Sequence, residues 1–195
     1  MNNPEYIIVN DHKYKINTDY RVVLRFDALI KDKNISEYEK IIGGFLMFFG
    51  EEGLKYKEDV NELGEKLFEY LQGRPNSTTG KKTKKKSVID MDYNKDFGLI
   101  MASMRSEYGI DIIKEKIHWW TFYDYLNGLS SECALNKVRE IRRKDLSKEK
   151  DINVRNEYRD LKDLYSLDKN KNDMTKKQID SVDTFYKLTG IERKE

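Results

Sequence analysis

Apolar side chains recur every three or four residues along most of the chain, which is the spacing of one face of an α-helix. Helices are predicted from Thr18 or Asp19, from the capping box Ser36-Glu37-Tyr38-Glu39, and over about 59–71. Further helices are predicted from Asp90 or Asp92, over about 111–127, from Ser130 or Ser131, from Ser147 and from Thr175. The pattern therefore predicts a mainly α protein, a helical bundle of about seven to eight helices.

The N-terminal residues 5–16 follow a different pattern, that of a small β-hairpin. Tyr6-Ile7-Ile8-Val9 is rich in β-branched and aromatic residues, and polar and apolar residues alternate from Lys13 to Ile16. Asn10-Asp11, between the two runs, has the composition of a turn. Because two strands alone are only marginally stable, we expect the hairpin to lie on the helices that follow.

Residues 73–87 interrupt the helical pattern, since they contain no aliphatic or aromatic residue. We predict a Lys-rich linker or extended loop there. It would separate a region of hairpin plus helices, 1–72, from a C-terminal helical region, 88–195. The alternative is one domain with a long loop, because either half alone is near the size at which cores become marginal.

The net positive charge of the chain is concentrated in this segment. The chain has 37 Lys and Arg against 35 Asp and Glu, and six of the basic residues lie between Arg74 and Lys86. The rest of the chain is therefore mildly acidic, and a basic body wrapped around nucleic acid is not expected. The run Lys81–Lys86 is compatible with nucleic-acid contact, but it has no interleaved aromatic to stack on bases, and a solubilising linker is the alternative.

The sequence contains no catalytic constellation. One Cys and two His cannot form a Cys/His zinc site, and Gly43-Gly44 lacks the Lys-Ser/Thr ending of a phosphate-binding loop. Cys133 is expected to be a buried, inert thiol, and the acidic pair Asp90/Asp92 to lie on a solvated face rather than to bind a metal. No apolar run approaches the ~18–20 residues of a membrane span. We expect a protein that is not an enzyme, with no cofactor, no metal and no membrane partner.

Two strongly apolar stretches, 41–49 and 117–126, favour partner binding. The chain is 38% hydrophobic and 37% charged, so core material is scarce and part of the burial is expected to come from a partner. The candidate partner-binding residues are Trp119, Trp120, Phe122, Tyr123, Phe45, Phe48 and Phe49. We expect one of the four on 119–123 to anchor the core and one to anchor the interface. An aromatic platform with a titrating His118 competes with plain packing of both Trp residues.

Three motifs then occur in order along the chain. They are Tyr14-Lys15-Ile16-Asn17-Thr18-Asp19-Tyr20-Arg21-Val22 with Phe26; Tyr108-Gly109-Ile110-Asp111 with His118-Trp119-Trp120, Phe122 and Leu126-Asn127-Gly128-Leu129; and Arg142-Arg143-Lys144-Asp145-Leu146-Ser147 with Tyr158, Leu161 and Tyr165. In this order the chain resembles the bacteriophage gene-product-fifteen family over roughly residues 5–167. Such proteins are encoded among the tail genes of long-tailed phages and prophages of Gram-positive bacteria.

The resemblance implies a non-catalytic role like that of tail assembly chaperones. These associate with the tape measure protein, and with other tail proteins, in the host cytoplasm during phage assembly, and they are absent from or minor in the mature virion. A structural virion or tail component is the alternative, followed by a nucleic-acid-binding accessory protein. Self-association of the chain and a longer frameshifted form stay open. The family has no catalytic residues to carry over.

Overall fold

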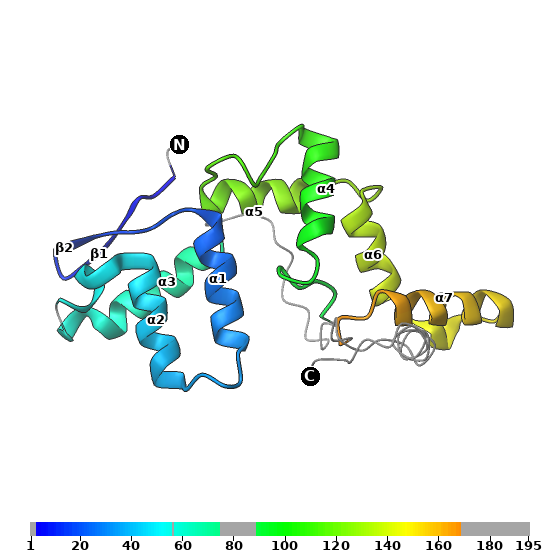
Figure 1. Ribbon diagram of the computed structural model, residues 1–195, viewed down its shortest axis with the longest axis horizontal. Coiled ribbons are helices and arrows are strands. Elements are labelled where there is room, and N and C mark those ends of the chain that lie inside the picture. Colours follow the sequence, from blue (N-terminus) through cyan, green and yellow to red (C-terminus); the bar gives the residue numbers. More distant parts are fainter. Residues whose placement is uncertain (1–2, 56, 75–88, 169–195) are drawn as a thin grey trace, which may run out of the picture. The chain divides into compact units, whose positions relative to one another are not determined.

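The computed structural model describes residues 3–55, 57–74 and 89–168 of the chain (Figure 1). These residues form seven α-helices and a two-stranded antiparallel sheet, which confirms the predicted mainly α fold with an N-terminal hairpin. The chain divides into two compact units, Met1–Arg143 and Lys144–Glu195, which we describe separately. The first unit therefore includes residues from both sides of 73–87. The run Lys81–Lys86 of the predicted linker and the helix predicted from Thr175 lie outside the described residues.

The hairpin consists of β1 (Tyr6–Val9) and β2 (His12–Lys15), which pair antiparallel with Tyr6 opposite Lys15. Asn10 and Asp11 connect the strands, and both have a positive φ, of 46° and 65°. Two-residue hairpin turns of the I′ type require this geometry, which Asn and Asp adopt more readily than most residues. The predicted turn is confirmed at these two residues.

A buried carboxylate fixes the hairpin to the helices. Asp59, directly before α3 (Val60–Leu71), accepts hydrogen bonds from Asn10 Nδ2 at 2.8 Å and Tyr14 Oη at 2.5 Å, and lies 2.6 Å from His12 Nδ1. The hydrogen bonds from Tyr14, Asn10 and His12 outweigh burial and lower the pKa of Asp59 to about 2. The hairpin therefore lies on α3, as its size led us to expect.

The first unit begins with three helices, α1 (Tyr20–Lys31), α2 (Glu37–Phe49) and α3, with short 3-10 turns at Gly50–Leu54 and Lys57–Asp59 between the last two. The predicted capping box is confirmed, because Ser36 Oγ accepts from the Glu39 N–H and the Glu39 carboxylate accepts from the Ser36 N–H. Asp19 caps α1 by accepting from the Arg21 N–H. Local sequence thus explains where these helices begin.

The first unit is completed by α4 (Phe97–Tyr108), α5 (Trp119–Gly128) and α6 (Ala134–Arg143). Gly109, with φ of 69°, ends α4 in the left-handed conformation that glycine adopts without strain. A buried bidentate ion pair joins the start of α4 to α6, with Arg142 nitrogens 2.7 and 2.8 Å from the two Asp96 oxygens. One continuous core of buried apolar residues runs from β1 to α6.

The helix predicted over 111–127 is correct only in its second part, because α5 begins at Trp119. The preceding residues instead make backbone bonds to the start of α1. The Trp119 N–H donates to Thr18 O at 2.7 Å, and the Tyr20 N–H donates to Ile117 O at 3.0 Å. The Arg21 guanidinium also donates to carbonyls in the segment 112–115. Several backbone carbonyls between residues 112 and 117 therefore accept hydrogen bonds from α1, and they are not available for the hydrogen bonds of a continuous helix.

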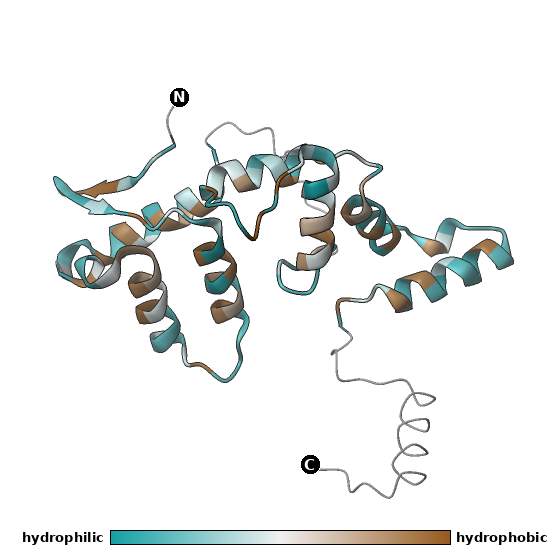
Figure 2. Cartoon of the chain, turned by 45° about the horizontal axis from the view of Figure 1, so that its top comes forward, coloured by the Kyte–Doolittle hydropathy of each residue, from teal (hydrophilic) through white to brown (hydrophobic). Residues whose placement is uncertain are grey.

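The second unit contains a 3-10 turn, Leu146–Lys148, followed by α7 (Ile152–Leu164). The predicted start at Ser147 is too early, because the Asp151 carboxylate accepts hydrogen bonds from the Asn153 and Val154 N–H groups and caps the helix there. Apolar residues recur along α7 (Figure 2), yet none of its residues is buried.

Candidate functional site

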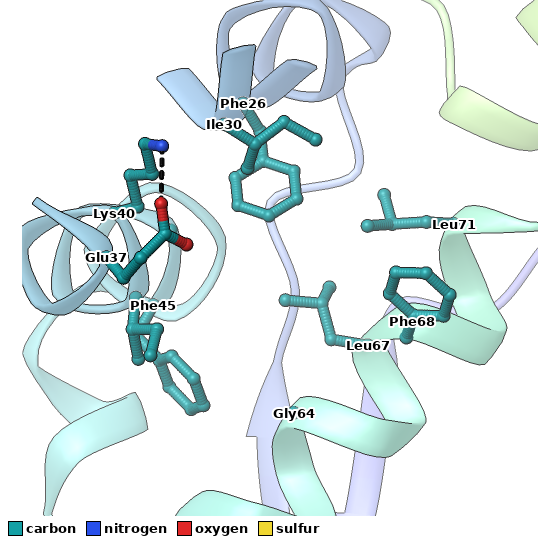
Figure 3. A pocket seen from close by; sticks show the side chains of 11 residues that line it. Phe26, Ile30, Glu37, Lys40, Phe45, Gly64, Leu67, Phe68 and Leu71 are labelled. Carbon is teal, nitrogen blue, oxygen red and sulfur yellow. Dashed lines mark hydrogen bonds and ion pairs between the residues drawn. The ribbon is translucent and has the colours of Figure 1, made fainter. Parts of the chain in front are cut away.

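The strongest candidate for a binding site is an apolar groove between α1, α2 and α3 (Figure 3). It consists of two neighbouring hollows of about 210 and 230 Å³ that share Phe26, Ile30, Phe68 and Leu71. The first hollow is also lined by Ile41, Gly44, Phe45, Gly64 and Leu67, with Glu37 and Lys40 at its edge, and the second by Val23, Asp27, Gln72, Tyr93 and Trp119. We call these residues together the α1–α3 groove.

Large apolar side chains stand exposed along this groove. Phe68 is 67% exposed, Ile41 53% and Ile30 46%, one from each of the three helices. Isolated exposed apolar residues are normal on a protein surface, but three converging on one hollow form a patch of the kind that marks interaction sites. Figure 3 shows Phe26 and Ile30 facing Leu67, Phe68 and Leu71 across the hollow.

Two glycines line the groove for different physical reasons. A Cβ on Gly44 would lie 2.7 Å from the ring of Phe26, so any side chain there would force this ring to move. A Cβ on Gly64 would lie 3.7 Å from the ring of Phe45, which is ordinary van der Waals contact. Glycine inside a helix costs about 0.5–1 kcal/mol relative to alanine. The packing of α3 therefore does not explain Gly64.

The charged groups at the groove are partly paired. Lys40 lies 2.7 Å from Glu37 at one edge, and Lys31 contacts both Asp27 at 2.6 Å and Asp92 at 2.8 Å. Burial alone would lower the pKa of Lys31, but the hydrogen bonds to the two aspartates outweigh it and raise that pKa. Both of these lysines are thus engaged with carboxylates of the same chain.

The four predicted partner-binding residues on α5 lie in a second region, which we call the α5 aromatic cluster: Trp119, Trp120, Phe122 and Tyr123 together with Tyr70 of α3. Trp119 is 2% exposed and Phe122 is fully buried, whereas Trp120 and Tyr123 are half-buried. Trp119 Nε1 donates to Leu71 O at 3.2 Å, and Trp120 Nε1 donates to Tyr70 O at 2.8 Å. Both indoles therefore cap the end of α3.

His118 has a structural role at the start of α5. Its Nδ1 accepts the Trp120 N–H at 3.0 Å, so Nε2 carries the proton in the neutral ring and donates to Pro4 O at 3.0 Å. Both ring nitrogens are occupied by backbone groups. This geometry favours the packing interpretation of the His-Trp-Trp motif over an aromatic platform with a titrating histidine.

The three predicted phenylalanines of α2 are buried. Phe45 lines the α1–α3 groove, whereas Phe48 and Phe49 border a mixed polar and apolar hollow beside β2. Ile30, Ile41, Gly64 and Phe68 line the groove but were absent from the predicted set. In the structure, Phe68 lies beside rather than within the buried stripe of Leu63, Leu67 and Tyr70 on α3. Sequence spacing alone gave no signal that separates it from this stripe.

The other candidate reactive groups in the sequence are buried or ion-paired within the described residues. Cys133 is buried, and Asp90 pairs with Arg139 and Arg143. Within the ranges 3–55, 57–74 and 89–168, no group of three or more His, Cys, Asp or Glu side chains is placed to hold a metal ion. No helix in the same ranges is long and apolar enough to cross a membrane.

Comparison with known protein families identifies a relationship for this chain. No curated protein and no solved structure matches the chain. A family model described as "Bacteriophage Gp15 protein" matches residues 3–167, which is more than half of the chain. The resemblance drawn from the three sequence motifs is thereby confirmed.

Proposed function

Because the chain belongs to the bacteriophage Gp15 protein family, we propose that it is a non-catalytic, tail assembly chaperone-like protein. In this proposal it binds the tape measure protein, alone or with other tail proteins, in the host cytoplasm while the phage tail is assembled. It then leaves the complex and is not abundant in the mature virion.

The observation that carries the proposal is the α1–α3 groove with its exposed Phe68, Ile41 and Ile30. A tape measure protein is long and helical and exposes apolar stripes until the tail tube surrounds it. Amphipathic helices commonly bind by placing such a stripe in an apolar groove. Several copies along one tape measure would strengthen the association through multivalency.

The proposal is tested by co-expressing the tagged full-length chain with the tape measure gene of the same phage and recovering complexes under native conditions. We expect the tape measure protein to co-purify with the chain and to aggregate when the chain is omitted. Purified virions are then probed with an antibody against the chain, and we expect little signal.

Two outcomes would favour the alternatives. Stoichiometric amounts of the chain in purified virions, without a tape measure complex, would indicate a structural tail component. DNA binding that weakens steeply with salt and is lost on deletion of residues 81–86 would indicate a nucleic-acid-binding accessory protein. Either result in place of tape measure binding contradicts the proposal.

A further inference from the structure

Gly64 indicates the shape of the partner that the α1–α3 groove binds. A Cβ at this position would meet only the ring of Phe45, at ordinary contact distance, so the fold itself has room for at least an alanine there. Gly44, which also lines the groove, is by contrast required by its contact with Phe26. Gly64 leaves unfilled space in the first hollow, which is also lined by the exposed Phe68, one helical turn further along α3.

On the α3 side, the charges next to the exposed face of the groove are acidic. Each residue along an α-helix is rotated by about 100° from the one before it, so Glu65 and Glu69 follow Gly64 and Phe68 on the side away from buried Leu67. Both glutamates are exposed, and within the described residues neither forms an ion pair. Lys66, the one basic residue of α3, falls on the far side of the helix. On α3, the unpaired charge on the groove side of the helix is therefore negative.

We propose that the α1–α3 groove binds an amphipathic α-helix with basic flanks. The apolar stripe of this helix enters the two hollows and places one large side chain over Gly64. Lys or Arg residues beside the stripe pair with Glu65 and Glu69, which adds specificity and speeds association. The inference rests on the proposed function only for the source of the helix, which would be the tape measure protein.

The test uses the full chain and two synthetic helical peptides, so it does not depend on a tape measure protein. Both peptides carry Leu at positions i, i+3, i+4 and i+7, with flanking Lys in one and flanking Glu in the other. Binding is followed by fluorescence anisotropy of the labelled peptides at low and at high salt. We expect the Lys-flanked peptide to bind at least about tenfold tighter, and this preference to shrink as salt screens the charges.

Matched variants assign the binding to the groove. Gly64→Leu fills the hollow with a good helix former and is expected to weaken binding of the Lys-flanked peptide by at least about tenfold, as loss of an interface anchor does. The control is Gly98→Leu on α4, where an added Cβ meets nothing within 4 Å and binding is expected to be unchanged. The double variant Glu65→Lys, Glu69→Lys is expected to reverse the preference between the two peptides. Thermal unfolding followed by circular dichroism verifies that each variant is folded.

Several results would overturn the inference. Failure of both peptides to bind would do so, as would equal binding of the two peptides or unchanged binding to folded Gly64→Leu. A homodimer that sedimentation detects and Gly64→Leu abolishes would make a second copy of the chain the occupant. Peptide binding without tape measure binding would leave the groove inference intact and contradict the proposed function. Tape measure binding that Gly64→Leu leaves unchanged would do the reverse.

Discussion

The α5 aromatic cluster and the α1–α3 groove lie on the same unit and share Trp119, yet they differ in how their side chains are engaged. Phe122 of the cluster stacks on Tyr20 of α1 with ring centroids 4.3 Å apart, and both indole N–H groups donate to the end of α3. In the groove, Phe68 makes no ring contact with any of the described residues and is mostly exposed.

Aromatic content alone therefore does not identify a binding surface. A buried tryptophan with a satisfied N–H stabilises the fold, because burial and hydrogen bonding are already complete. An exposed phenylalanine beside an open hollow leaves apolar area that only another molecule can cover. The following substitutions test this contrast, beginning with the largest expected effect.

Trp119→Ala should destabilise the fold most. It removes a buried side chain and the hydrogen bond to Leu71 O, and truncation of a buried aromatic typically costs about 3–5 kcal/mol. Chemical denaturation of the full chain measures the loss of unfolding free energy. A change below ~1 kcal/mol would mean that the cluster is not a core element and would end the contrast with the groove.

Gly44→Ala should destabilise by about 1–3 kcal/mol, because the added methyl overpacks the α1–α2 contact and forces the Phe26 ring to move. Gly64→Ala is the matched control and has the opposite expected sign. It should stabilise by about 0.5–1 kcal/mol, since the methyl fits and the helix gains propensity. Equal destabilisation by both substitutions, measured by thermal unfolding, would remove the distinction between the two glycines.

Asp59 should make the hairpin side of the unit sensitive to acid. Its folded-state pKa of about 2 lies below its ordinary value of 3.8, so folding favours the charged carboxylate. The corresponding stability is fully present above about pH 4 and is lost as pH falls towards 2. In urea titrations across this range, Asp59→Asn should be less stable at neutral pH and lose less stability on acidification than wild type. Parallel curves for the two proteins would contradict this role, and Glu65→Gln, on exposed α3 surface, serves as the control.

Phe68→Ala should have the smallest effect on folding, within about 0.5 kcal/mol, because the side chain is already 67% exposed. Its binding of the Lys-flanked peptide should nevertheless fall by about tenfold or more. Denaturation and anisotropy measured on the same preparation separate the two effects. A large loss of stability would show that Phe68 supports the fold rather than a partner.

Much of the fold could be predicted because its signals are local. The hairpin turn depends on Asn10 and Asp11, and the start of α2 depends on Ser36 and Glu39, all within a few residues of one another. The start of α5 could not be predicted in this way. Its position depends on the hydrogen bond from the Trp119 N–H to Thr18 O, between residues far apart in sequence.

The site was harder to predict for the same reason. Phe45 and Trp119, chosen for their aromatic content, do line the groove, but both are buried. Ile30, Ile41 and Phe68 have the helical spacing of core residues, and sequence alone does not tell which member of an apolar stripe the neighbouring helix fails to cover. That depends on how α1, α2 and α3 pack together.

The anchoring of both ends of the Lys-rich segment has a consequence for variation in its length. On one side Arg74 is held by Asp124 at 2.6 Å and Asn3 at 2.7 Å, and on the other Asp90 is held by Arg142 through its carbonyl and by Arg139 through its carboxylate. Contacts within the first unit therefore position both ends of this connection. Doubling a connection costs only about 0.6 kcal/mol in closure entropy. Insertions or deletions between these two anchors should leave the fold intact, and a single backbone cut there should leave the two fragments associated. The segment is therefore a suitable place to attach a label or a fused domain.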